Sequence, residues 1–201
     1  MGTRSVVADG DTREQILERA IGLFARAGYA GVSVRDVASE VGVSAAALYH
    51  HFPDKQALYL AAVEHAFVRR EFGVLAALES ELPPFERLRG FVERFAELVA
   101  GDERFRKLVQ RELLDGDAAR LELLAQHVFR KPHAAIVALA RELATDLDPN
   151  MLANSVIGLV LFAFETAPLR RHLEGYSPGQ DQPGAVTRHV MRLLTRVFAY
   201  R

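Results

Sequence analysis

The sequence predicts an all-α protein, with a small N-terminal helical domain followed by a larger helical domain. Apolar residues recur three and four positions apart through the stretches that look ordered, which is the period of an amphipathic helix. The strict alternation of apolar and polar residues that indicates a half-buried strand is absent from the pattern. Glycine and proline separate the periodic stretches, at Gly101, Gly116, Gly175 and the segment 178–184.

The first helix is predicted to run from Thr12 to about Ala27, because its apolar residues fall on one side. These residues are Ile16, Leu17, Ala20, Leu23, Phe24 and Ala27. The segment 1–11 before it is polar and contains glycine. We expect that segment to form a flexible arm.

Two short helices are predicted between residues 33 and 52. The apolar face of the first is formed by Val34, Val37, Ala38 and Val41, spaced i, i+3, i+4 and i+7. Gly42 stands where this pattern stops, as expected for a left-handed residue after a helix. Ser44 can then cap the second helix with its hydroxyl. Two short helices joined by a tight glycine turn are typical of a helix-turn-helix, whose second helix enters the DNA major groove.

The composition of the second short helix supports this interpretation. Residues 45–47 are all alanine, so the helix is slim enough to approach a DNA backbone. Leu48 and Phe52 can anchor it inward, which leaves a Tyr-His-His run at 49–51 exposed, with Lys55 just beyond. Tyrosine, histidine and lysine suit contacts to phosphate, which set register on the duplex. A helical hairpin packed in a core is the alternative, and it gives no reason to expose that run beside a lysine.

Residues from about Thr12 to Leu60 resemble the DNA-binding domain of the TetR family of transcriptional regulators. The resemblance is carried by Ile16, Leu17, Ala20, Leu23, Phe24, Gly28, Tyr29 and the stretches 33–38, 42–44 and 48–58. It implies a helix-turn-helix DNA-binding domain over 12–60 and a helical regulatory and dimerisation domain over 61–201. Many family members carry lysine, proline or glycine after the serine at the start of the recognition helix. Here Ala45 to Ala47 follow, which leaves few side-chain donors for base edges.

We expect the motif to contact duplex DNA in two ways. The expected phosphate contacts are Ser33, Tyr49, His51 and Lys55. The expected base-edge contacts are Arg35, Ala45, Ala46 and His50. Ser44 is also a DNA-binding candidate, because it stands at the N-terminal end of the helix that enters the groove. Residues 1–60 hold six Lys or Arg and seven Asp or Glu, a net charge of −1. A positive face must therefore come from the local placement of Arg35, Lys55, Arg4 and Arg13.

Further helices are predicted along the rest of the chain. Asp54 caps a long helix that ends near Leu78, and Pro83-Pro84 interrupts the pattern. Later helices are expected over about 85–100, 102–114, 117–145, 149–173 and 184–199. Pro132 falls inside one of them and should kink or split it.

The last two predicted helices have broad apolar surfaces. Their apolar residues are Met151, Leu152, Val156, Leu159, Val160 and Phe162 in one helix and Val190, Leu193, Leu194, Val197 and Phe198 in the other. The family resemblance implies that these helices pair with their copies in a four-helix dimer interface. The alternative is that they form only an intramolecular core. A dimer is favoured because a two-fold symmetric protein gains a second DNA half-site.

Several polar residues interrupt the apolar stripes of the larger domain. We expect a ligand cavity between helices, a common place for small-molecule sites, with these polar residues and nearby aromatic ones around it. The candidate ligand-binding residues are Phe91, Phe95, Phe105, Glu112, His127, Phe129, His133, Phe162 and Glu165. The alternative for each polar residue is exposure at an edge, or pairing with an arginine such as Arg111 or Arg130. A buried carboxylate needs such a partner.

The composition excludes several classes of protein. The 201 residues include no cysteine, so a disulfide framework and a thiolate metal site are excluded. No charged and apolar leader opens the sequence, and the longest apolar run, 156–164, is too short to span a membrane. We therefore expect a cytoplasmic protein. The sequence lacks a glycine-rich phosphate loop, a nucleophile elbow and a zinc-binding His-Glu-x-x-His helix, so we expect neither an enzyme nor a cofactor. A metal site from Glu112, His127 and His133 is supported only by their co-occurrence.

Together these features predict a homodimeric transcriptional regulator that binds operator DNA and is released from it by a small, mainly apolar molecule. The alternative is a ligand-independent helical DNA-binding scaffold or nucleoid-associated protein. A panel of small molecules would separate the two, since only binding to the folded state raises thermal stability.

Overall fold

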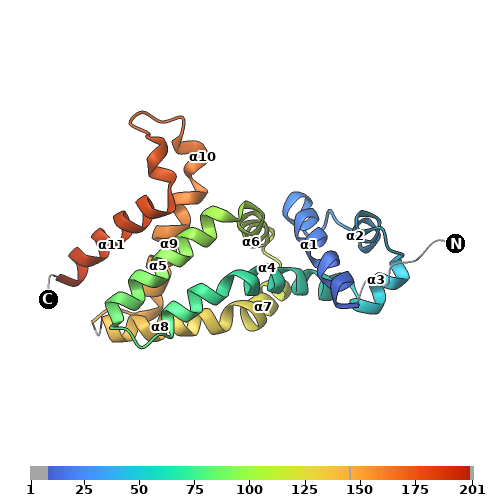
Figure 1. The fold of residues 1–201 in the computed structure, drawn as a ribbon, viewed down its shortest axis with the longest axis horizontal. Coiled ribbons are helices and arrows are strands. Elements are labelled where there is room, and N and C mark those ends of the chain that lie inside the picture. The colour runs from blue at the N-terminus through green and yellow to red at the C-terminus, as the bar shows by residue number, and fades with distance from the viewer. Residues whose placement is uncertain (1–8, 145, 200–201) are drawn as a thin grey trace. The chain divides into compact units, whose positions relative to one another are not determined.

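The computed structural model describes residues 9–144 and 146–199. Within these ranges every regular element is a helix, which confirms the all-α class (Figure 1). Residues 1–8 of the expected arm, including Arg4, lie outside the described residues. The helix α1 (Asp9–Ala27) begins at residue 9, so positions 9–11 are helical rather than part of an arm. A single glycine at position 10 costs a helix only about 1 kcal/mol relative to alanine, which is too little to stop it.

The chain divides into two compact units. The first comprises residues up to Arg69 together with Arg104–Val128, and the second comprises Arg70–Glu103 together with the chain from Phe129 onward. The boundary expected at residues 60–61 falls inside the helix α4 (Lys55–Leu78). The segment 104–128 belongs with the N-terminal residues, because its side chains bond to them. Arg111, for example, donates to the carbonyl oxygens of Ala25 and Arg26 in α1 at 3.0 and 2.8 Å.

The first unit contains α1, α2 (Val34–Val41), α3 (Ala45–His51), the N-terminal part of α4, most of α6 (Glu103–Asp115) and α7 (Ala118–Leu124). In sequence, α1 is followed by the helix-turn-helix pair, and α2 packs against both α1 and α3. The buried residues of α1 repeat at helical spacing and include Ile16, Leu17, Ala20, Ile21 and Phe24. They form the core on which the two short helices rest.

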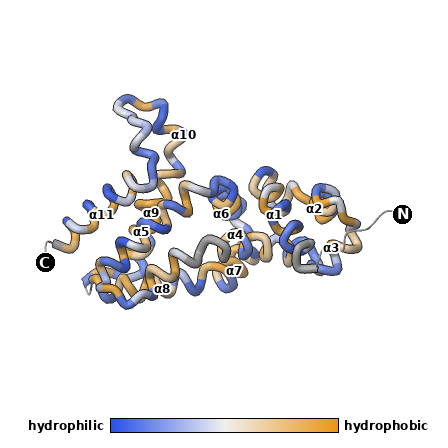
Figure 2. The backbone as a smooth tube through the Cα atoms, viewed as in Figure 1, coloured by the Kyte–Doolittle hydropathy of each residue, from blue (hydrophilic) through white to orange (hydrophobic). Residues whose placement is uncertain are grey.

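The second unit is built around α5 (Pro84–Gly101), which packs against α8 (Arg130–Leu143), α9 (Pro149–Glu165) and α11 (Pro183–Ala199). Its core contains apolar residues from all four helices, including Leu88, Val92, Leu139, Val160 and Leu194. Figure 2 shows hydrophobic and hydrophilic stretches alternating along α5 and α11, as expected for helices with one buried side. The helices predicted over 85–100, 102–114 and 184–199 occur as α5, α6 and α11, with ends within one residue of the prediction.

The helix predicted over 117–145 is split. It consists of α7, a π-helical segment η1 (Ala125–Phe129) and α8. Pro132 has no N–H to donate to the carbonyl of residue 128, four positions earlier, and the helical register changes just before it. The predicted effect of Pro132 is therefore confirmed.

The helix predicted over 149–173 ends earlier than expected. The helix α9 stops at Glu165, and a short helix α10 (Ala167–Arg170) follows. Pro168 cannot donate to the carbonyl of residue 164, so the α-helical ladder is interrupted there. Among the described residues, no helix combines the length and the apolar character needed to span a membrane.

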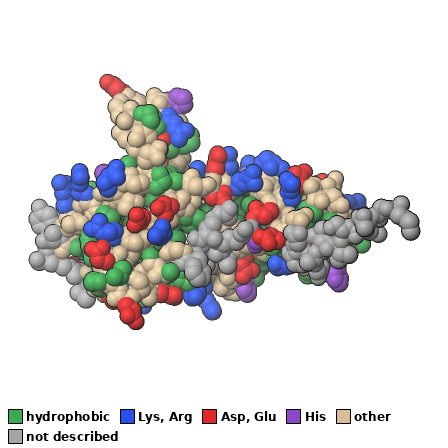
Figure 3. Space-filling model, in the orientation of Figure 1, with side chains coloured by type: hydrophobic (Ala, Val, Ile, Leu, Met, Phe, Trp, Pro, Cys, Tyr) green, Lys and Arg blue, Asp and Glu red, His purple; other side chains and the backbone are tan. Residues whose placement is uncertain are grey.

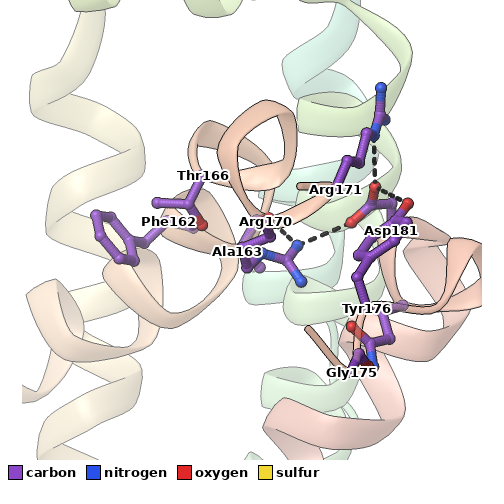
Figure 4. A network of polar contacts seen from close by, with 9 residues as sticks. Phe162, Ala163, Thr166, Arg170, Arg171, Gly175, Tyr176 and Asp181 are labelled. Carbon is purple, nitrogen blue, oxygen red and sulfur yellow. Dashed lines mark hydrogen bonds and ion pairs between the residues drawn. The ribbon is translucent and has the colours of Figure 1, made fainter. Parts of the chain in front are cut away.

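A carboxylate holds the connection between α10 and α11 in place. Asp181 lies in the short 3₁₀ helix η2 (Pro178–Asp181) and accepts hydrogen bonds from Arg170, Arg171 and Tyr176 at 2.8, 3.0 and 2.7 Å (Figure 4). These bonds lower the pKa of Asp181, against the opposing effect of burial. The cluster thus fixes the loop that leads into α11.

Candidate DNA-binding site

The first helix of the helix-turn-helix is capped by a reciprocal pair of hydrogen bonds. The backbone N–H of Asp36 donates to Ser33 Oγ at 3.1 Å, and the backbone N–H of Ser33 donates to Asp36 Oδ2 at 2.7 Å. This is a capping box, which satisfies two of the backbone donors left over at a helix start. The bonds lower the pKa of Asp36, so this carboxylate stays ionised at neutral pH.

The turn between α2 and α3 depends on Gly42. This residue has φ of +81° and ψ of +27°, the left-handed conformation predicted for it, and its N–H donates back to Ala38 O. Ser44 then caps α3, because its Oγ accepts from the N–H of Ala47 at 3.1 Å. The predicted roles of Gly42 and Ser44 in the local fold are confirmed.

The recognition helix α3 has one buried and one exposed side. Leu48 and Phe52 are buried, at 0% and 2% exposure, so both anchor the helix inward as predicted. Ala46, Tyr49 and His50 are exposed, while Ala45 and His51 are half-buried. A short helix with an exposed outer face has the form of an element that can enter a DNA groove.

Lys55 begins the next helix and is well placed to act with α3. Asp54 just before it accepts from the N–H of Ala57 at 2.7 Å, which confirms it as the cap of α4. The ammonium group of Lys55 lies 4.4 Å from the centre of the Tyr29 ring. Burial, and next the charge of Arg120, lower the pKa of Lys55 from its usual value of 10.5.

The remaining DNA-binding candidates are also at the surface. Ser33, Arg35 and Ser44 are exposed, although the hydroxyls of both serines already accept cap bonds. Arg13 of α1 lies over the ring of Phe52 at 5.2 Å, next to the end of α3. The site therefore presents arginine and lysine cations around an α3 surface that is itself mostly alanine, tyrosine and histidine. Such a surface can neutralise phosphates and approach bases closely, but offers few hydrogen bonds to base edges.

The candidate ligand-binding residues are divided between the two units. Phe105, Glu112 and His127 are in the first unit, and Phe91, Phe95, Phe129, His133, Phe162 and Glu165 are in the second. Phe91 and Phe105 are buried, and Phe95, Phe129 and Glu165 are half-buried. His127, His133 and Phe162 are exposed, Phe162 at 68%. Among the described residues, no three His, Cys, Asp or Glu side chains are arranged to hold a metal ion.

Glu112 is buried and fully engaged within the first unit. Its two carboxylate oxygens accept from the hydroxyl of Tyr59 at 2.8 Å and from Arg120 Nε at 2.9 Å. The partner is Arg120 rather than Arg111 or Arg130. A cavity of about 10 Å³ lies between α5, α8, α9 and α11 in the second unit, and its lining includes none of the predicted ligand residues. A space of this size holds at most one water molecule.

The sequence reasoning missed two residues beside the candidate DNA-binding site. In the sequence, Tyr29 stands out only through the family resemblance, and no pattern marks Arg120. The guanidinium of Arg120 lies 4.2 Å from the centre of the Tyr29 ring. No sequence pattern signals this contact, because the two residues are far apart in the chain.

This arrangement defines a helix-turn-helix followed by a helical C-terminal domain. Residues 16–62 match the family described as bacterial regulatory proteins, tetR family. Residues 84–199, more than half of the chain, match the family described as the C-terminal domain of the HTH-type transcriptional dual regulator CecR. The chain belongs to the TetR family of regulators.

Similar proteins agree with this assignment. The chain is 38% identical over 91 residues to the HTH-type transcriptional repressor AcnR of Corynebacterium efficiens, which covers 43% of this chain and 46% of that protein. It thus spans less than half of the length of the curated relatives that it matches first.

Two solved structures share the fold over almost the whole chain. A transcriptional regulator from Pseudomonas aeruginosa PAO1 has a TM-score of 0.78 and 21% identity, covering 98% of this chain and 95% of that one. AibR in complex with isovaleryl coenzyme A and operator DNA has a TM-score of 0.68 and 23% identity, covering 90% and 97%. At these identities the likeness establishes the fold alone.

Proposed function

We propose that the chain is a homodimeric transcriptional repressor that binds operator DNA through α3 and is released by a small, mainly apolar effector. The observation that carries the DNA-binding part is the exposed face of α3, which lies opposite the buried anchors Leu48 and Phe52. Lys55 follows at the start of α4. The phosphate contacts are Ser33, Tyr49, His51 and Lys55. Arg35, Ala45, Ala46 and His50 face the base edges.

Selection of bound duplexes from a random DNA pool tests this part. We expect a roughly palindromic site, with half-sites about one helical turn or a multiple of it apart, ~34–36 Å per turn. Enrichment without any common sequence would instead favour the nucleoid-associated scaffold.

The exposed side of α9 supports the homodimer. Met151, Leu159 and Phe162 lie on that side and are 66%, 39% and 68% exposed, with Ser155 and Gly158 between them at helical spacing. A side chain added at Gly158 would meet no other atom within 4 Å, so a second helix can approach closely there. Leu169 and Leu173, at and just beyond the end of α10, are 65% and 56% exposed. Figure 3 shows hydrophobic side chains beside charged ones on the surface of the α10 segment.

Other apolar residues of α9, and several of α11, are buried inside the protomer instead. Leu152, Val156 and Val160 of α9, and Val190 and Leu194 of α11, are buried in the core of the second unit. We therefore place the dimer surface on the narrower exposed stripe of α9; Val197 of α11 is also exposed, at 54%. Unpartnered apolar side chains in one stripe are typical of an interface.

We place the effector in the second unit. The second unit holds mostly apolar side chains, and Phe91 and Phe95 stack at a centroid distance of 5.5 Å. To enter the cavity of about 10 Å³ among α5, α8, α9 and α11, a ligand larger than a water molecule must separate these helices. We propose that Glu165, which is half-buried, and His133, which is exposed, orient the ligand. That AibR was solved with an acyl coenzyme A and operator DNA makes acyl chains a sensible first panel.

Ligand affinity measured with and without operator DNA tests the effector role. Coupling between two sites is reciprocal, so operator should weaken effector binding by the same factor as effector weakens operator binding, on the order of 5–150-fold. Equal affinities in both conditions would remove the release mechanism and leave the DNA-binding role intact.

A further inference from the structure

The ring of Tyr29 carries two cations from distant parts of the first unit. Lys55 Nζ lies 4.4 Å from the ring centre, and the guanidinium carbon of Arg120 lies 4.2 Å from it. A cation within about 6 Å of an aromatic ring is attracted by the electrons on the ring face. Tyr29 therefore joins the start of α4, next to the recognition helix, to α7.

Other aromatic side chains hold the Tyr29 ring in place. The ring of Tyr59 meets it edge-on, at a centroid distance of 5.1 Å and an angle of 78°. Phe24 lies parallel to it at 6.3 Å and contacts Tyr59 edge-on at 4.9 Å. Phe24 and Tyr59 are buried, at 0% and 2% exposure, so the ring is supported by the core of the unit.

Arg120 is held equally firmly. Its Nε donates to the buried carboxylate of Glu112 at 2.9 Å, and its terminal nitrogens lie 3.3 Å from Asp117 and 3.9 Å from Asp115. Only 13% of the Arg120 side chain is exposed. A guanidinium fixed by three carboxylates keeps its position over the ring.

We propose that Tyr29 and Arg120 are positioning residues for Lys55 and hold its ammonium group where it meets a DNA phosphate. This inference rests on the proposed DNA-binding function and adds two residues that lie outside the helix-turn-helix pair.

Two physical effects favour DNA binding in this arrangement. A lysine that is already ordered loses less conformational freedom on binding, which corresponds to about 2- to 10-fold in affinity. The positive charges of Lys55 and Arg120 also repel each other, and a phosphate relieves that repulsion.

The test uses the ring itself, because its removal leaves the Glu112 carboxylate paired. We expect Tyr29→Leu to weaken binding of the full-length protein to a selected duplex about 2- to 10-fold, with the slope of log affinity against log salt unchanged, since Lys55 still meets its phosphate. Tyr29→Phe is the matched control, because it keeps the ring, and should bind like wild type. In a Lys55→Ala background, Tyr29→Leu should have no further effect.

The variant Arg120→Gln provides a second, independent experiment. We expect it to weaken DNA binding only when Lys55 is present. Arg111→Gln is its control, because Arg111 bonds to the backbone of α1 rather than lying over the ring. Thermal melting of each variant identifies any that do not fold. If Arg120→Gln does not fold, the comparison of Tyr29→Leu with Tyr29→Phe decides whether Lys55 is positioned in this way.

The outcomes separate this inference from the function on which it rests. If Lys55→Ala changes neither affinity nor salt slope, Lys55 meets no phosphate and this inference is overturned, while DNA binding through α3 stands. Failure of the wild-type protein to bind any duplex would overturn the function itself. If Lys55→Ala acts but the effects of Tyr29→Leu and Lys55→Ala simply add, the positioning role is wrong and DNA binding stands. If the single variant Arg120→Gln lowers the salt slope by about one, Arg120 itself contacts a DNA phosphate. That result also overturns the positioning role of Arg120.

Discussion

The hydroxyl of Tyr59 donates a 2.8 Å hydrogen bond to Oε2 of Glu112, 53 positions further along the chain. Both side chains are buried, at 2% exposure each, and Arg120 binds the other carboxylate oxygen. A buried carboxylate is costly unless such partners satisfy it. The bond therefore stabilises the packing of α6 against α4, and it occupies a carboxylate that the sequence alone suggested for an effector.

Removal of this bond should be measurable as a loss of stability. We expect Tyr59→Phe to lower the free energy of unfolding by about 1.5–3 kcal/mol, the range for a hydrogen bond to a charged group. Urea unfolding at neutral pH measures it. Tyr49→Phe is the control, because Tyr49 is 49% exposed and its substitution should change stability little. Equal stability of both variants would contradict the importance of the bond.

The raised pKa of Tyr59 predicts that the protein loses stability in alkali. Burial, and next the Glu112 carboxylate, raise the pKa of Tyr59 far above its usual value of 10.0. The folded state therefore holds the phenol proton more tightly than the unfolded state, so stability is fully present below about pH 10 and falls as the pH rises beyond it. The urea midpoint should decline above that pH in wild type and decline less steeply in Tyr59→Phe. Parallel curves for the two proteins would assign the decline to other groups.

Lys55 should act on DNA binding without regard to sequence. We expect Lys55→Ala to weaken binding to specific and random duplexes by a similar factor and to lower the salt slope by about one, because one phosphate contact is lost. Fluorescence anisotropy over a range of salt concentrations measures both quantities. Arg141→Ala removes an exposed cation on α8 and should leave the slope unchanged. Loss of affinity for only one sequence would make Lys55 a base-reading residue instead.

Gly42 should resist substitution for a conformational reason. Gly42→Ala is expected to lower the free energy of unfolding by about 1–2 kcal/mol, the cost of a left-handed backbone for a residue with Cβ. Its added Cβ would meet no atom within 4 Å, so a clash is not the cause. Gly101→Ala, at the end of α5, has the same open space without a positive φ and should be neutral or stabilising. Thermal or urea unfolding of the two variants gives the comparison.

The exposed stripe on α9 should control the oligomeric state. We expect Phe162→Glu to yield a folded monomer in sedimentation velocity, because a charge would enter an apolar interface. Leu114→Glu alters a residue of α6 that is 79% exposed and should leave the dimer intact. Val160→Glu differs from both, since Val160 is fully buried and its substitution should unfold the protomer. A wild-type monomer at micromolar concentration would contradict the dimer.

Much of the local structure could be predicted from the sequence. The caps at Ser44 and Asp54, the left-handed Gly42 and the break near Pro132 depend on residues at most a few positions apart. Hydrogen bonds of this kind join residues that are close in the chain, so the pattern of residue types is sufficient to predict them. The inward anchors Leu48 and Phe52 followed from helical periodicity in the same way.

Only the tertiary structure decided which distant residues meet. Tyr59, Glu112 and Arg120 come together, and α6 and α7 join the first unit, because of packing that no local pattern encodes. On α9 the apolar residues divide into a buried set and an exposed set, although periodicity treats them as one surface. The physical reason is that helical propensity and capping act over one turn of chain, whereas burial and ion pairing depend on which helices pack against each other.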